Sequence, residues 1–157
     1  MCLAILKPSK VVLPEDHIRE GWISNPDGGG YGFVDDKGKI VTRKGFHKLK
    51  EFMDAYKKDE AQYTESPFLV HFRICTMGSK GEDNTHPFEI ENGILIHNGT
   101  LGGTSAKYGE GKSDTALFAE AFSKDLTFDF VYENKEELNA ALNYNKVAIL
   151  YKDKRWT

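Results

Sequence analysis

Residues 68–75 read FLVHFRIC and form the most strand-like run in the first half of the chain. Apolar side chains dominate this run, and His71 and Arg73 interrupt it with polar ones. A short apolar run that is bounded by turn residues predicts a strand buried in a sheet. The presence of the polar residues His71 and Arg73 in a strand that is predicted to be buried therefore needs a chemical explanation.

Further strands and helices are predicted on both sides of this run. Apolar patterns, with turns such as Asn92-Gly93 between them, predict strands at residues 2–6, 31–35, 39–42, 88–90, 94–97 and 147–151. Helical spacing predicts helices over residues 14–24 and 47–61 and a third that begins after Ser113. Residues 126–145 fit neither pattern. The chain is expected to be one domain of the α+β class.

Two of the predicted helices show an apolar face. In the helix opened by Pro14, the face is expected to carry Ile18, Trp22 and Ile23. In the helix after Ser113, the expected apolar face consists of Leu117, Phe118, Ala121 and Phe122.

Composition limits the function classes. The 157 residues carry 21 Lys and Arg against 24 Asp and Glu, a net charge of −3, so strong phosphate attraction and nucleic-acid binding are not expected. No apolar stretch approaches the ~20 residues of a membrane span, and the N-terminus lacks a signal-peptide pattern, so a cytoplasmic protein without membrane contact is expected. The two cysteines, Cys2 and Cys75, form neither a disulfide scaffold nor a CxxC pair.

Because Cys2 directly follows Met1, it can become the N-terminal residue, which Cys75 cannot. Removal of Met1 would leave a thiol and a free α-amine on one residue. The α-amine has a pKa of about 7.7 to 8.0, so in its neutral form it can take the thiol proton without a histidine. The alternative is that Cys2 is a small buried hydrophobic residue in a strand.

Five short motifs follow Cys2 in order. They are NPDGGG at residues 25–30, HFRICTMG at 71–78, NTHP at 84–87, HNG at 97–99 and SDT at 113–115. With these motifs the chain, over residues 2 to about 120, resembles the class II glutamine amidotransferases of the N-terminal nucleophile hydrolase superfamily. The resemblance implies a four-layer αββα sandwich of two antiparallel sheets and a single amidotransferase domain over residues 1–157, either a minimal version or a fragment.

The resemblance implies that Cys2 attacks the side-chain amide of glutamine and forms a γ-glutamyl thioester. The Asn98 side-chain amide and the Gly99 backbone N–H would then form the oxyanion hole. Asn98-Gly99 taken by itself is also typical of a tight hairpin turn. No cofactor is implied. Glutamine is the expected substrate, and an ammonia-accepting synthetase or transferase is the expected partner.

The resemblance also implies how the substrate is held. Arg73 would bind the α-carboxylate of glutamine and Asp114 its α-ammonium group, which selects a zwitterion. A guanidinium within an apolar strand is costly unless an anion meets it, which agrees with that role. The alternatives are a structural ion pair for Arg73 and a first-turn helix charge for Asp114. Three further residues are expected to line or close the substrate pocket: Thr76, Gly78 and His86.

Other functions remain open at this point. One is an N-terminal-nucleophile amidohydrolase that acts on another γ-glutamyl or amide substrate, and another is a catalytically silent or nucleotide-binding domain. Residues 106–113, AKYGEGKS, match a relaxed phosphate-loop pattern, but no strand precedes them. Structural roles are expected for His71, His86 and His97, because their spacing matches no short metal motif, so no metal is expected.

Overall fold

The computed structural model describes residues 2–107 and 110–157. It contains two antiparallel sheets. The first sheet has the strand order β1 (Leu3–Lys7), β4 (Phe68–Phe72), β2 (Gly29–Val34) and β3 (Ile40–Phe46). The second has the order β5 (Phe88–Ile90), β6 (Gly93–Asn98) and β7 (Lys146–Tyr151).

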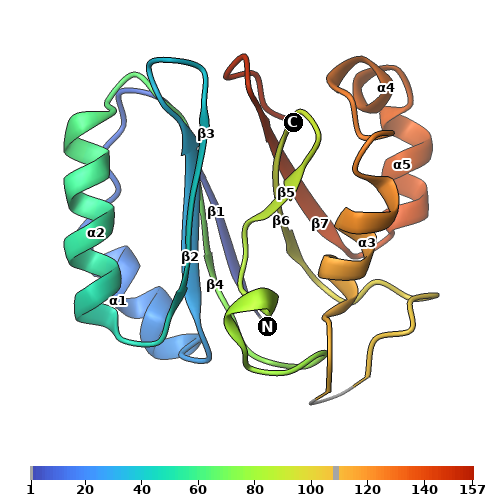
Figure 1. Cartoon of the computed structure of the whole chain (residues 1–157), viewed down its shortest axis with the longest axis horizontal. Coiled ribbons are helices and arrows are strands. Elements are labelled where there is room, and N and C mark those ends of the chain that lie inside the picture. The colour runs from blue at the N-terminus through green and yellow to red at the C-terminus, as the bar shows by residue number, and fades with distance from the viewer. Residues whose placement is uncertain (1, 108–109) are drawn as a thin grey trace.

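The helices lie outside the two sheets. Helices α1 (Glu15–Ser24) and α2 (Leu49–Gln62) cover the first sheet, and α3 (Asp114–Phe122), α4 (Phe128–Glu133) and α5 (Lys135–Leu142) lie beside the second (Figure 1). A short 3₁₀ helix, η1 (Glu82–Asn84), precedes β5. This order of layers is compatible with the expected sandwich.

Three apolar clusters hold these layers together. Between α1, α2 and the first sheet lies an aromatic cluster that includes Trp22, Tyr31 and Phe52. A second cluster joins the two sheets and consists of Val34, Leu69, Ile94, Ile96 and Leu150. A third joins the second sheet to α3 and the segment after it, and includes Leu95, Ala116, Ala119 and Leu126.

Strand β4 is central to the first sheet, as its apolar run predicts, but it ends at Phe72, so the predicted strand is wrong for Arg73, Ile74 and Cys75. All five of its residues are buried, and it pairs antiparallel with β1 on one side and with β2 on the other. Phe72 lies opposite both Leu3 and Gly29. This register places the residues after β4 beside the start of β1 and the glycines that begin β2.

The predicted face of α1 is wrong at Ile23, which is 74% exposed. Ile18 and Trp22 are buried as expected, and Gly21 is buried with them. A Cβ atom on Gly21 would lie 2.6 Å from Leu3 Cδ2. The helix therefore approaches the sheet through Gly21, which turns Ile23 toward solvent.

Helix α3 begins as predicted, because the Ser113 hydroxyl accepts a hydrogen bond from the Ala116 N–H at 3.2 Å. Its predicted apolar face is right only in part: Phe118 packs against the third cluster, but the buried residues are Ala116 and Ala119, and Phe122 is 46% exposed. The cap and the buried Asp114 fix the rotation of the helix about its axis.

Residues 126–145, ambiguous in sequence, contain α4 and α5, neither of which has a buried residue. Within the described residues, every helix is too short or too polar to cross a bilayer.

The cluster between the sheets should contribute to stability. Ile94 is fully buried there, so Ile94→Ala is expected to lower the free energy of unfolding by about 2–5 kcal/mol. Ile23→Ala makes the same chemical change at an exposed position, and its effect should stay within about 0.5 kcal/mol. Urea unfolding of both variants measures the difference. Equal losses would contradict the packing described here.

Candidate active site

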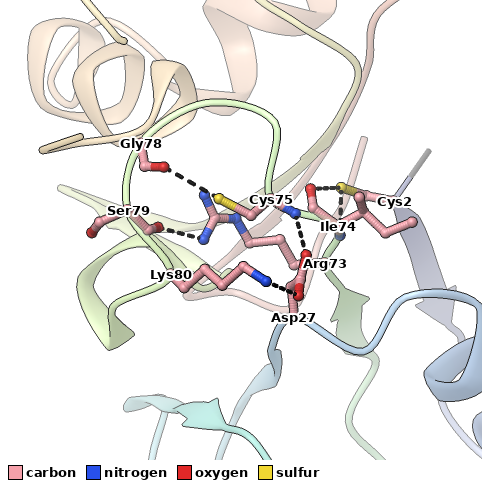
Figure 2. A network of polar contacts seen from close by, with 8 residues as sticks. All are labelled: Cys2, Asp27, Arg73, Ile74, Cys75, Gly78, Ser79 and Lys80. Atoms are coloured by element: carbon pink, nitrogen blue, oxygen red, sulfur yellow. Dashed lines mark hydrogen bonds and ion pairs between the residues drawn. The ribbon is translucent and has the colours of Figure 1, made fainter. Parts of the chain in front are cut away.

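Cys2 lies against the backbone that follows β4. Its Sγ atom is 3.4 Å from both the backbone nitrogen and the carbonyl oxygen of Ile74, and the side chain is half-buried (Figure 2). The pairing of β1 with β4 produces this contact, because residue 2 directly precedes Leu3, the partner of Phe72. The thiol is therefore held within one strand spacing of Arg73.

A small cavity joins Cys2 to most of the predicted site residues. Its lining includes Cys2, Arg73, Thr76, His86, Gly99 and Asp114. Asn98 is absent from the lining but contacts Cys2 directly, because its Nδ2 donates to the Cys2 carbonyl oxygen at 2.7 Å. The remaining predicted residue, Gly78, lies behind the lining.

Gly78 supports the site through its backbone. Its φ of 73° lies in the left-handed region, and a Cβ atom at this position would lie 2.6 Å from the Ser113 nitrogen. Its carbonyl oxygen accepts a hydrogen bond from the Cys75 thiol at 3.2 Å. Only glycine allows this close approach of the loop to the start of α3.

Arg73 is buried without a carboxylate partner among the described residues. The side chain is 4% exposed, and its Nη1 atom donates to the Ser79 carbonyl oxygen at 2.8 Å (Figure 2). Its Nη2 atom donates to the Met77 carbonyl oxygen at 2.6 Å. These two bonds curl residues 77–79 around the guanidinium. The structural ion pair that was the alternative for Arg73 is not formed within the part of the chain described.

The NPDGGG motif holds the backbone of the same segment. Gly28 accepts a hydrogen bond from the Arg73 N–H at 2.8 Å, and the Asp27 N–H donates to the Arg73 carbonyl at 3.0 Å. The Asp27 carboxylate accepts from the Cys75 N–H at 3.0 Å and pairs with Lys80 at 2.6 Å. The Lys80 ammonium and then the Cys75 N–H lower the pKa of Asp27. Through these hydrogen bonds the motif fixes the backbone of residues 73–75.

Asp114 is the opposite charge in the cavity. It is 5% exposed, and its carboxylate accepts from the Leu101 N–H at 2.7 Å and from the Thr115 N–H at 2.9 Å. No cationic side chain pairs with it among the described residues. Arg73 and Asp114 therefore line one cavity as buried charges of opposite sign that are not paired with each other.

Asn98 and Gly99 lie where β6 ends, next to Cys2. The Asn98 Oδ1 atom is buried and has no hydrogen-bond partner among the described residues. Gly99 has a φ of 142°, and a Cβ atom there would lie 2.2 Å from Asn145 Oδ1. In this structure the Asn98 amide donates to Cys2 itself, and its role toward an oxyanion stays a prediction.

Three histidines, which also line the cavity, connect the two sheets. The rings of His71 and His86 stack with their centroids 3.8 Å apart. His71 Nε2 donates to the His97 carbonyl oxygen at 3.0 Å, and the His97 N–H donates to His86 Nδ1 at 3.2 Å. Burial lowers the pKa of His71 to about 3 and that of His86 well below its usual value. These contacts suit the structural role expected for the histidines.

Sequence reasoning assigned no role to Thr115, Asn145 or Asn84. His97 Nδ1 lies 2.8 Å from the Thr115 hydroxyl, and His97 Nε2 lies 2.8 Å from Asn145 Oδ1, so both residues orient the ring. Asn84 is 1% exposed and bonds two separate segments, at Ser79 and at residues 111–113. Thr115 and Asn84 lie within two of the five sequence motifs, and that position could have marked them as candidate site residues. Asn145 falls in the ambiguous region and had none.

The phosphate-loop-like segment 106–113 lies partly outside the described residues. No strand precedes it in residues 99–105, and the Lys112 ammonium pairs with Glu120. The described residues contain no group of three or more His, Cys, Asp or Glu side chains that could hold a metal ion.

One curated protein is similar to part of the chain. Over 93 residues it is 29% identical to a glutamine–fructose-6-phosphate aminotransferase (isomerizing) of Buchnera aphidicola subsp. Acyrthosiphon pisum (strain APS). The aligned part covers 59% of this chain but only 15% of the aminotransferase. No family model matches the chain. This weak, partial similarity hints at the glutamine amidotransferases and makes an enzyme plausible.

Acid should destabilise the fold through the buried histidines. In the unfolded chain they bind protons as the pH falls below about 6.5, while in the folded protein His71 stays neutral down to a pKa of about 3. The unfolded state then binds more protons, so the free energy of unfolding should fall between about pH 6 and pH 4, by up to about 1.4 kcal/mol per pH unit for each histidine.

Urea unfolding across this pH range measures the decline. The double variant His17→Gln/His47→Gln is the control, because both side chains are exposed and its decline should match that of the unmodified protein. A flat profile would show that His71 and His86 are not neutral in the folded state.

Proposed function

We propose that this chain is a glutamine amidotransferase domain that hydrolyses the side-chain amide of glutamine with Cys2 as its nucleophile. One observation carries the proposal. Arg73 and Asp114, both buried and not paired with each other, line the same cavity as the Cys2 thiol. Buried charges are costly unless they are compensated, and a bound zwitterion would compensate both.

The headgroup chemistry of glutamine fits this pair. Its α-carboxylate would meet the Arg73 guanidinium, which offers a planar fork of donors. Its α-ammonium group would meet the Asp114 carboxylate. The side chain would then extend toward Cys2 and present its amide carbon to the thiol. In this proposal Thr76 and His86 complete the pocket wall, and Gly78 keeps the loop in place.

The reaction uses groups of this chain alone. The Cys2 thiol gives its proton to the α-amine that removal of Met1 exposes, and the sulfur attacks the amide carbon. Asn98 and Gly99 donate to the resulting oxyanion. The C–N bond then breaks as the α-ammonium returns the proton, which releases ammonia and leaves the γ-glutamyl thioester. Water hydrolyses the thioester to glutamate and restores the Cys2 thiol.

The buried Asn98 Oδ1 atom supports the role of the α-amine. An unpartnered buried acceptor is costly, and a donor on the neighbouring Cys2 would satisfy it. Met1 lies outside the described residues, so the processed terminus is part of the proposal. In the same proposal the layers form the αββα sandwich of N-terminal nucleophile hydrolases over residues 1–157, and a synthetase or transferase uses the ammonia.

Loss of Cys2 should abolish the reaction. Cys2→Ala is expected to lower ammonia release from glutamine at least about 10³-fold, because no other nucleophile is available to form the thioester. Cys75→Ala is the matched control, since it removes the only other thiol, which lies outside the cavity lining. It should retain activity and labelling by a glutamine-analogue electrophile. Intact mass should show that Met1 is absent from active protein. Turnover by Cys2→Ala, or by protein that keeps Met1, would overturn the mechanism.

Arg73 and Asp114 together should select substrates that carry an amino-acid headgroup. Arg73→Lys and Asp114→Asn are each expected to raise KM for glutamine about tenfold or more, through loss of a charge-assisted contact. Glutaramate lacks the α-ammonium group and should be a poor substrate that Asp114→Asn does not worsen. Arg19→Lys and Asp54→Asn make the same changes at exposed positions and serve as controls. Equal turnover of glutaramate and glutamine would favour an amidase with another substrate.

A further inference from the structure

Two segments, one that follows Arg73 and one that precedes Asp114, are hydrogen-bonded to the buried side-chain amide of Asn84. Asn84 ends η1 and is 1% exposed. Its Nδ2 atom donates to the Ser79 carbonyl and hydroxyl oxygens, both at 3.1 Å, and to the Gly111 carbonyl at 2.7 Å. Its Oδ1 atom accepts from the Ser113 N–H at 2.6 Å. Both ends of the amide are thus occupied.

One end of this amide reaches the carbonyl that holds Arg73. The Ser79 carbonyl oxygen accepts from Asn84 Nδ2 and also from Arg73 Nη1, at 2.8 Å. A displacement of Ser79 would therefore move a principal anchor of the guanidinium. Figure 2 shows this carbonyl directed at the guanidinium.

The other end of the amide reaches the residue before Asp114. Ser113 is the N-cap of α3, and its hydroxyl accepts from the Ala116 N–H. Its own N–H is bonded to Asn84, so the start of the helix is tied to η1. The position of the Asp114 carboxylate depends on where this first turn begins.

The groups around the Asn84 amide are packed too closely to shift relative to one another. A Cβ atom on Gly78 would lie 2.6 Å from the Ser113 nitrogen and 3.0 Å from Asn84 Nδ2. Close-packed polar groups with fixed partners hold their neighbours at set distances.

We infer that Asn84 is a positioning residue that sets the span between Arg73 and Asp114 and thereby selects substrates with an α-amino-acid headgroup. The inference rests on the proposed function. The two charges lie on different segments, and Asn84 is bonded to an anchor of each. A fixed span favours a ligand whose two charges are held at one separation, as they are in a zwitterion with both charges attached to one carbon. It also opposes direct pairing of Arg73 with Asp114, which would close the site.

The test compares glutamine with glutaramate for unmodified protein, Asn84→Ala and Asn84→Asp. Asn84→Asp is nearly isosteric and keeps the acceptor for Ser113 while losing the donors to Ser79 and Gly111. Both variants are expected to raise KM for glutamine about tenfold with kcat nearly unchanged, and to lower the preference for glutamine over glutaramate by a similar factor. Labelling of Cys2 by iodoacetamide, which needs no headgroup, should proceed at the unmodified rate.

Ser66→Ala is the matched control for a lost buried hydrogen bond. Ser66 is fully buried and donates to the Val34 carbonyl, away from the cavity. It should lower the unfolding free energy without changing the substrate preference.

The outcomes separate this inference from the proposed function. If the unmodified protein releases no ammonia from glutamine, the proposed function fails and the inference fails with it. If the unmodified protein is active but the Asn84 variants keep its substrate preference, or lose kcat equally for both substrates, only the positioning role is overturned.

Discussion

The buried guanidinium of Arg73 is the constraint on which the site depends. A charge that is 4% exposed and has no carboxylate within salt-bridge distance among the described residues is stabilised mainly by nearby dipoles, with a longer-range attraction to Asp27. The carbonyls of Met77 and Ser79 supply them, which determines the path of residues 77–79. This path in turn places Ser79 against Asn84, and Asn84 against the start of α3. One buried cation thus organises both walls of the cavity.

The site is built across the two sheets. Cys2 and Arg73 belong to the first sheet or its immediate continuation, while Gly99 follows β6 of the second. The apolar cluster between the sheets and the hydrogen bond from His71 to the His97 carbonyl hold these halves in register. Stability and site geometry therefore depend on the same contacts. These histidines are neutral first because burial disfavours the charged imidazolium and secondly because it would be repelled by the nearby guanidinium.

Local features were predictable from the sequence. The β4 run, the turn between β5 and β6 and the Ser113 cap each depend on residues within a few positions of one another. The run and the cap are confirmed, while the turn lies at Glu91 and Asn92, one residue before the predicted Asn92-Gly93, because Gly93 already pairs with Ile90. Features that depend on packing were not predictable. Ile23 has the same apolar character as Ile18, and only the approach of α1 to the sheet through Gly21 makes one exposed and the other buried. The exposure of Phe122 has the same kind of cause.

For the candidate site, the sequence by itself determined the chemical groups: a cysteine at position 2, an arginine in an apolar run, an aspartate at a helix start and the order of the motifs between them. Only the tertiary structure decided that Cys2, Arg73 and Asp114 line one cavity, that the two charges do not pair, and that Asn84 connects their supports. The reason is physical. These relations are hydrogen bonds to backbone carbonyls and N–H groups, which every residue carries, so no residue type marks them until the chain has folded.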